Sequence, residues 1–134
     1  MAAPFTSPPI AVPAAAREGR FDRADIVVEG LEQAGPSFRA HLFLNNPAAD
    51  AGTERTPEAG YAGALNVYAQ GPAPGVELQA PPGGGAVAPI TKNIIATEAV
   101  RAALRDAAEL TVTVVPERGA PVPLQVGRVS IVFR

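Results

Sequence analysis

The sequence predicts a mainly β protein: an antiparallel β-sandwich of the jelly-roll or Greek-key type with one short helix and an extended N-terminal arm. Two observations favour this class. Several short runs are rich in β-branched and aromatic residues and are bounded by Gly, Pro or Asn, and one segment alone has a convincing helical period. A chain of 134 residues that is 47% hydrophobic and 18% charged is expected to form a single domain with its own core.

The first 20 residues are rich in Pro and Ala and are predicted to be extended, with no helix, because each Pro removes a backbone donor and restricts its neighbour. We therefore divide the chain into an arm, 1–20, and a sandwich domain, 21–134. The sizeable apolar groups of the arm are Phe5, Ile10 and Val12, the candidate interaction residues. They dock either on a neighbouring subunit or along a sheet edge of the same chain. We favour the neighbour, which predicts a homo-oligomer.

Six runs are predicted to be strands. The run 110–115 is expected at the centre of a sheet, because apolar residues occur on both of its faces. The last run has an apolar face at a period of two, which is typical of a half-buried strand. The predicted strands are 24–31, 38–44, 61–68, 76–80, 110–115 and 124–133.

One helix is predicted over residues 97–107. Thr97 is expected to cap it, and Glu98 favours the positive end of the helix dipole. Its apolar stripe consists of Val100, Ala103, Leu104 and Ala107.

Two loops separate these elements, a polar one at 45–60 and a Gly/Pro-rich one at 71–89. The glycines at 83–85 do not form a phosphate-binding loop, because the Lys-Ser/Thr pair and the following helix of such a loop are missing. A linker or binding loop is the expected role.

Composition excludes several classes of function. The 11 basic and 13 acidic residues give no excess positive charge for nucleic acid. The chain has no Cys, so disulfides, Cys-based metal sites and thiol catalysis are ruled out. The apolar stretches are shorter than the roughly 20 residues that cross a bilayer, so we expect no membrane partner. No basic residue precedes Arg17, so a secretory signal is not indicated and a cytoplasmic protein is expected.

The sequence offers little material for a catalytic or metal site. Its one histidine, His41, cannot hold a metal alone, because such sites need three or four ligands. We expect His41 to be a surface residue of a strand or an interfacial ligand completed by another chain. The pairs Asp22/Asp25 and Glu29/Glu32 are expected to be ordinary solvated charges. No catalytic residue and no cofactor are predicted, and His41 joins the arm residues as a candidate interaction residue.

Five short motifs follow one another in a fixed order along residues 24–134. An opening strand motif that contains Glu-Gly is followed by two motifs that end in Asn, then by a Val-Thr-rich strand and a closing Gly-containing strand. They are Ile26 to Leu31, Phe43-Leu44-Asn45, Tyr61 to Asn66, Val112 to Pro116 with Arg118, and Val126, Gly127, Val129 and Ile131.

This ordered set resembles the small C-terminal domain of plant and bacterial polyphenol oxidases and tyrosinases, which is named for a KFDV motif. The KFDV position holds Arg39-Ala40-His41-Leu42 here, and the Pro-His that follows the third motif in that family is absent. The arm lies outside the resemblance. In such enzymes the dicopper centre is built by His residues of a separate helical domain, so the resemblance implies that this chain is not the oxidase.

The preferred hypothesis is thus a non-catalytic accessory module or subunit. The resemblance implies that it packs against a tyrosinase-like dicopper protein, which it covers, stabilises or helps to mature. An alternative is a self-assembling structural protein whose arm docks on neighbouring subunits. A carbohydrate-binding module is a third candidate, but the lack of Trp counts against it because sugar platforms favour large aromatic faces.

Overall fold

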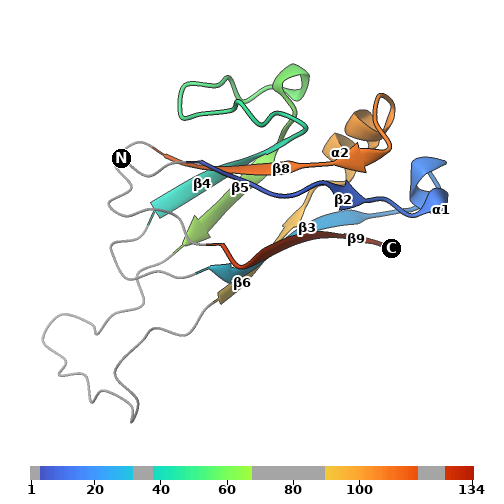
Figure 1. Cartoon of the computed structure of the whole chain (residues 1–134), viewed down its shortest axis with the longest axis horizontal. Coiled ribbons are helices and arrows are strands. Elements are labelled where there is room, and N and C mark those ends of the chain that lie inside the picture. The colour runs from blue at the N-terminus through green and yellow to red at the C-terminus, as the bar shows by residue number, and fades with distance from the viewer. Residues whose placement is uncertain (1–3, 32–37, 68–89, 118–125) are drawn as a thin grey trace, which may run out of the picture.

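The computed structural model describes residues 4–31, 38–67, 90–117 and 126–134, and these residues form the expected antiparallel β-sandwich (Figure 1). One layer has the strand order β1-β8-β4-β5, the other has the order β6-β3-β9, and β2 and β7 form a small ribbon. The strands are β1 (Phe5–Thr6), β2 (Ile10–Ala11), β3 (Ala24–Leu31), β4 (Phe38–Leu44), β5 (Tyr61–Val67), β6 (Ile90–Ile95), β7 (Glu109–Leu110), β8 (Val112–Pro116) and β9 (Arg128–Phe133). The helices are α1 (Ala14–Arg17), the 3-10 turn η1 (Pro57–Ala59) and α2 (Thr97–Leu104).

Strand β8 lies inside the four-stranded layer, between β1 and β4, which confirms the predicted central position of this run. Val112 and Val114 are fully buried in the core between the layers. The opposite face of β8 is also covered, since Thr113 and Val115 are buried. The hydroxyl groups of Thr113 and Thr6 share a hydrogen bond of 3.1 Å, which ties β1 to the outer side of β8.

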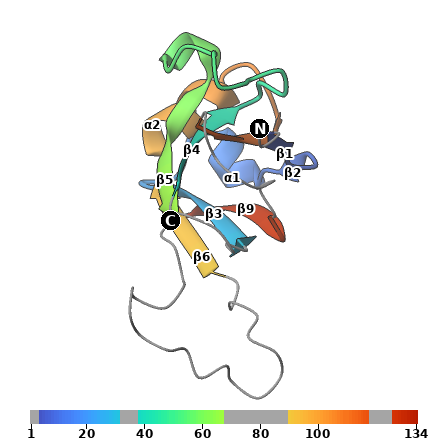
Figure 2. The same cartoon turned by 90° about the vertical axis from the view of Figure 1, so that its left-hand side faces the viewer.

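Strand β3 is the centre of the second layer, and it turns Ala24, Ile26 and Val28 towards the core. On β9 the apolar face predicted by alternation packs inward as expected. Strand β6 was not among the predicted strands, because Thr91, Lys92 and Asn93 give it a polar middle that hides the strand pattern. Figure 2 shows β6 beside β5, so these two edges close one side of the sandwich. The predicted strand at 76–80 lies outside the described residues.

Helix α2 forms where it was predicted, but it is shorter and its cap differs. It ends at Leu104, and Ala96 occupies the N-cap position without a side-chain hydrogen bond. The Thr97 hydroxyl instead accepts a hydrogen bond of 3.2 Å from the backbone N–H of Ala24, so it fastens the helix to β3. Val100 is the buried residue of the helix. Within the described ranges, no helix has the length and apolar character needed to span a membrane.

The N-terminal segment packs on its own chain and forms part of the sandwich. β1 pairs with β8 and β2 pairs with β7. The segment thus docks along strands of its own chain, the alternative to the neighbouring subunit that we favoured from the sequence. Val12 and Ala16 are buried in the main core, and Phe5 and Ile10 pack against it. The expectation that no helix forms here was wrong. One turn, α1, follows Pro13, because Pro is tolerated where a helix begins and its missing N–H has no partner there.

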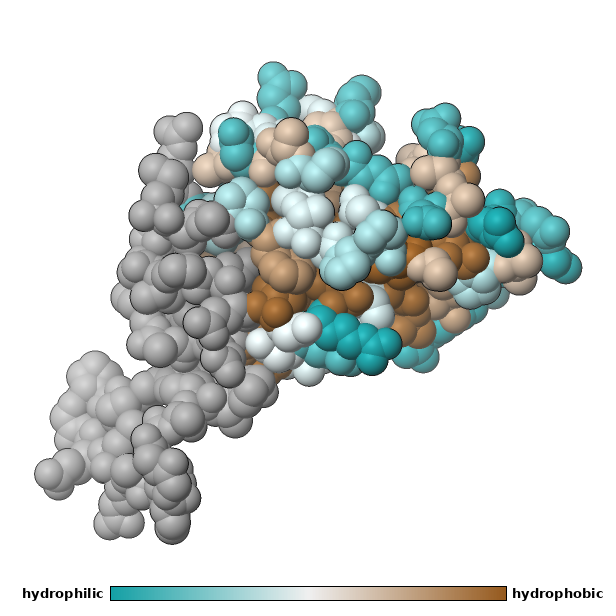
Figure 3. Space-filling model, viewed as in Figure 1, coloured by the Kyte–Doolittle hydropathy of each residue, from teal (hydrophilic) through white to brown (hydrophobic). Residues whose placement is uncertain are grey.

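Phe21 joins this segment to the far end of the core. Its ring meets Phe133 of β9 edge to face at a centroid distance of 5.1 Å. Arg101 of α2 covers the Phe21 ring at 4.4 Å and donates hydrogen bonds to the carbonyl groups of Phe21 and Gly19. Beside these elements, hydrophobic residues reach the surface in a band between the two layers, as Figure 3 shows. The chain entering β3 is therefore held by β9 and by α2.

Two glycine positions are required by close backbone contacts. Gly30 has a φ of +71°, and a Cβ there would lie 2.9 Å from the Cα of Gly127. At this crossing the N–H of Gly127 donates to the carbonyl of Glu29 at 2.9 Å. Gly60 has a φ of +84°, and a Cβ there would lie 2.2 Å from the carbonyl oxygen of Leu44. A side chain at Gly30 or Gly60 would therefore both clash and strain the backbone.

We expect Val114→Asp to lower the free energy of unfolding by about 3 kcal/mol or more, because it buries an unpaired charge. Urea denaturation measures this loss, and Asn66→Asp on β5 is the control, since Asn66 is exposed and lies beside Arg39. A loss for Val114→Asp no larger than that for the control would show that β8 is not buried.

The alanines of α1 test whether the N-terminal segment belongs to the core. Ala16 is buried and Ala15 is exposed. Ala16→Asp should therefore lower the melting temperature strongly, whereas Ala15→Asp should change the stability by less than about 1 kcal/mol. Equal effects of the two substitutions, measured by calorimetry, would contradict the docking of this segment on its own chain.

Candidate functional site

His41 is buried, which corrects the expectation of a surface residue. It lies on the outer face of β4, and only 5% of it is exposed. The face was expected to meet solvent, but the 45–60 segment folds across it. This cover forms a second small core of Phe43, Ala49 and Val115, with Ala51, Ala59 and Tyr61 packed against it.

Both ring nitrogens of His41 are engaged. Nε2 lies 2.7 Å from Oε1 of Glu117, and Nδ1 lies 3.1 Å from the hydroxyl oxygen of Tyr61. When the ring is neutral and donates a hydrogen bond from Nε2 to the carboxylate, Nδ1 accepts a hydrogen bond from the Tyr61 hydroxyl group. Arg55 approaches the same Glu117 oxygen at 3.6 Å. These four side chains connect β4, β5, the end of β8 and the 45–60 segment.

The charges of this network hold it together. The hydrogen bond from His41 lowers the pKa of Glu117, and Arg55 and Arg39 act in the same direction. A cavity of about 250 Å³ lies beside the network. Among the described residues, no group of three His, Cys, Asp or Glu side chains is placed to hold a metal ion. The arrangement therefore fastens the 45–60 segment to the sheet.

Asp25 is also buried, so the expectation that it is a solvated charge was wrong. Its side chain is fully covered on β3, and Oδ1 accepts a hydrogen bond of 2.8 Å from Nε of Arg23. Oδ2 lacks a hydrogen bond of ordinary geometry in the described part of the chain. The bond from Arg23 lowers the pKa of Asp25, and Asn93 and Arg134 lower it further. Asp22, which the sequence analysis grouped with Asp25, is exposed as expected.

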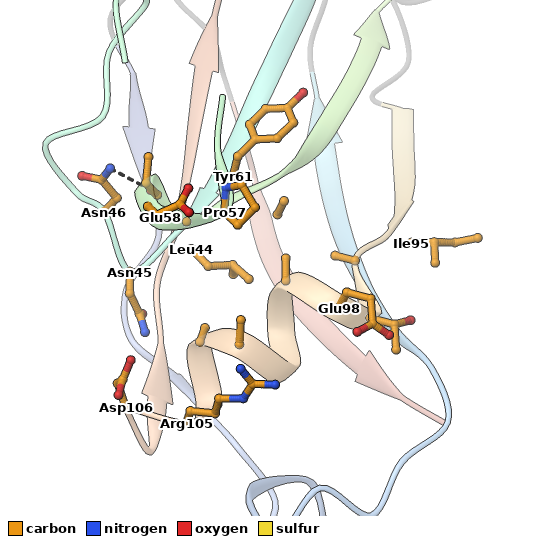
Figure 4. Close-up of a pocket in the computed structure, with 18 residues that line it drawn as sticks. Leu44, Asn45, Asn46, Pro57, Glu58, Tyr61, Ile95, Glu98, Arg105 and Asp106 are labelled. Atoms are coloured by element: carbon orange, nitrogen blue, oxygen red, sulfur yellow. Dashed lines mark hydrogen bonds between the residues drawn. The ribbon is translucent and has the colours of Figure 1, made fainter. Parts of the chain in front are cut away.

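A groove of about 930 Å³ separates α2 from η1 and the start of β5 (Figure 4). Its walls are mostly small side chains, and charged residues stand at its rim. It arises from the packing of elements that are distant in sequence, so no local pattern predicts it. Its lining includes Ala62, Ala99, Ala102 and Ala103, with Glu58, Glu98, Arg105 and Asp106 at the rim.

The candidate interaction residues do not form one site. Phe5, Ile10 and Val12 pack on the main core, whereas His41 belongs to the covered outer face of the sheet. The groove and the network lie on either side of Tyr61. In Figure 4 the Tyr61 ring points away from α2, and Ile95 points outward at the far right, away from the helix.

The fold of the chain is similar to part of solved polyphenol oxidase structures. A latent aurone synthase (polyphenol oxidase) from natural source matches with a TM-score of 0.63 and 19% identity over 97% of this chain and 24% of that chain. The recombinantly expressed latent enzyme matches with a TM-score of 0.59 and 19% identity over 98% of this chain and 23% of that chain. The chain thus spans about a quarter of these proteins. The resemblance inferred from the motifs is confirmed at the level of the fold.

In the comparison by sequence, no protein-family model matches the chain, and the curated proteins contain no significant relative. The structural likeness therefore rests on the arrangement of the strands.

The lowered pKa of Glu117 predicts a pH-dependent contribution to stability. Its folded-state pKa lies below the unfolded value, so the charged carboxylate stabilises the fold near neutral pH and loses this effect as the pH falls through the folded-state pKa. We expect Glu117→Gln to reduce the free energy of unfolding at about pH 7 and to differ less from the wild type at about pH 3. The exposed Glu54→Gln is the control. An equal deficit of Glu117→Gln at both pH values in urea denaturation would contradict this role.

Proposed function

We propose that the protein is a non-catalytic accessory β-sandwich that packs against the copper-containing domain of a tyrosinase-like oxidase and covers or stabilises it. One observation carries this proposal. Almost the whole chain matches the polyphenol oxidase structures, yet it accounts for only about a quarter of those chains. The remainder of such a protein is therefore the natural partner, whether it is joined to this module or separate from it.

The side chains available in this chain support a non-catalytic role. A dicopper centre needs several imidazole ligands, and this chain has one His. Its Nε2 and Nδ1 atoms are both occupied by hydrogen bonds within the fold. Recruiting His41 as a ligand would require the 45–60 segment to open and Glu117 to lose its partner.

The action we propose is mechanical. Packing of the two-layered sandwich over the entrance of a copper site would exclude bulky phenols while leaving the metal centre assembled. The matched structures are described as latent enzymes. A covering module would account for latency by occupying the surface through which a substrate enters.

The test uses the dicopper oxidase domain encoded with this module, in the same chain or in a neighbouring reading frame. The isolated module should bind no copper and oxidise no catechol. Added to the oxidase domain, it should lower the rate of catechol oxidation without removing copper, or slow the thermal loss of that activity. Stoichiometric copper and catechol oxidation in the isolated module would refute the non-catalytic role. An oxidase domain whose rate and thermal stability are both unchanged would refute the covering role.

A further inference from the structure

The outer face of β6-β3-β9, which is turned away from the other layer, carries two exposed large apolar side chains. Ile95 is 62% exposed and Val132 is 36% exposed. Both lie directly across from Asp25 on the central strand, Ile95 from the side of β6 and Val132 from the side of β9. They therefore flank a single point on the central strand of this layer.

Arg23 stands at the same point and is held in place by the buried carboxylate. Its Nε donates to Oδ1 of Asp25 at 2.8 Å, while its side chain remains 46% exposed. Among the residues that the structure describes, Arg23 makes its hydrogen bond and its ion pair through Nε, which leaves the two terminal nitrogens of the guanidinium group for another acceptor. Because Asp25 already fixes the side chain, Arg23 loses little conformational freedom when it binds a second carboxylate.

The exposed charge on this face is mainly positive. Arg134 lies close enough to Asp25 to influence its ionisation, and Arg128 is exposed on the same side of β9 as Val132. Glu29 faces Arg128 across the strands and is half-buried. A second copy of the chain would bring like charges together here, whereas an acidic surface is electrostatically complementary.

We propose that Arg23, Ile95 and Val132, the Arg23 face, dock an acidic surface of the partner protein. An Asp or Glu of the partner binds the terminal nitrogens of Arg23, and aliphatic side chains beside it cover Ile95 and Val132. Arginine is enriched among the residues that dominate binding at protein interfaces, and its hydrogen bonds to carboxylates are among the stronger ones. The inference rests on the proposed function, because it takes the oxidase domain as the partner and names the surface that binds it.

Calorimetric titration of the oxidase domain with variants of the full chain tests the inference. Ile95→Ser and Arg23→Gln should each weaken binding about tenfold or more. Ile95→Ser shortens an exposed side chain and places no new charge beside Asp25, so it should keep the melting temperature and its effect is not one of folding. Ala15→Ser on the exposed side of α1 is the control and should bind as the wild type does. Wild-type affinity in both Arg23-face variants would overturn the inference and leave the proposed function intact.

If the wild-type protein does not bind the oxidase domain, the proposed function fails. A peptide then tests separately whether the Arg23 face binds an acidic, aliphatic surface. The probe is a short acetylated and amidated peptide of alternating leucine and glutamate, and its lysine counterpart is the control. The acidic peptide should shift the NMR amide signals of Arg23, Ile95 and Val132, and less so at high salt. The absence of such shifts, or equal shifts with the lysine peptide, would overturn the inference.

Discussion

The pairing of the N-terminal segment with β7 and β8 is the constraint on which the sandwich depends. It gives β8 a neighbour on each side and places Val12 and Ala16 in the core between the layers. Ordering a Pro-rich segment costs roughly 1 to 2 kcal/mol per residue in backbone entropy. Burial of Val12 and Ala16 and the two strand pairings act against this cost. The same pairings cover an edge that would otherwise be open to other chains.

The motifs that suggested the family occur where the fold restricts the backbone. Gly30 and Gly127, from the first and last motifs, touch at the crossing of β3 and the chain entering β9. Asn45, from the second motif, has a φ of 53° and accepts a hydrogen bond of 2.9 Å from the N–H of Thr111 through its side chain. Because these backbone contacts restrict the residues allowed at Gly30, Gly127 and Asn45, the motifs can be detected although overall sequence similarity is low.

Local patterns predicted most of the fold, but long-range contacts decided the candidate site. Enrichment in β-branched and aromatic residues located β3 and β4, alternation marked the core face of β9, and helical spacing located α2. Alternation also placed His41 on one face correctly, but it does not reveal that a distant loop covers that face. Asp25 and the groove were missed for the same reason, since neighbouring strands and packed elements create their surroundings.

The proposed role requires a sandwich that acts through its surfaces. The arm packs within the chain, His41 is bonded to Glu117 and Tyr61, and Ile95, Val132 and Arg23 meet on one exposed face. Light scattering of the protein, the dicopper oxidase domain and their equimolar mixture tests this role most directly. We expect a protein of 13.7 kDa alone and a one-to-one complex in the mixture. A protein that self-associates and leaves the oxidase domain at its own mass would contradict the proposed role.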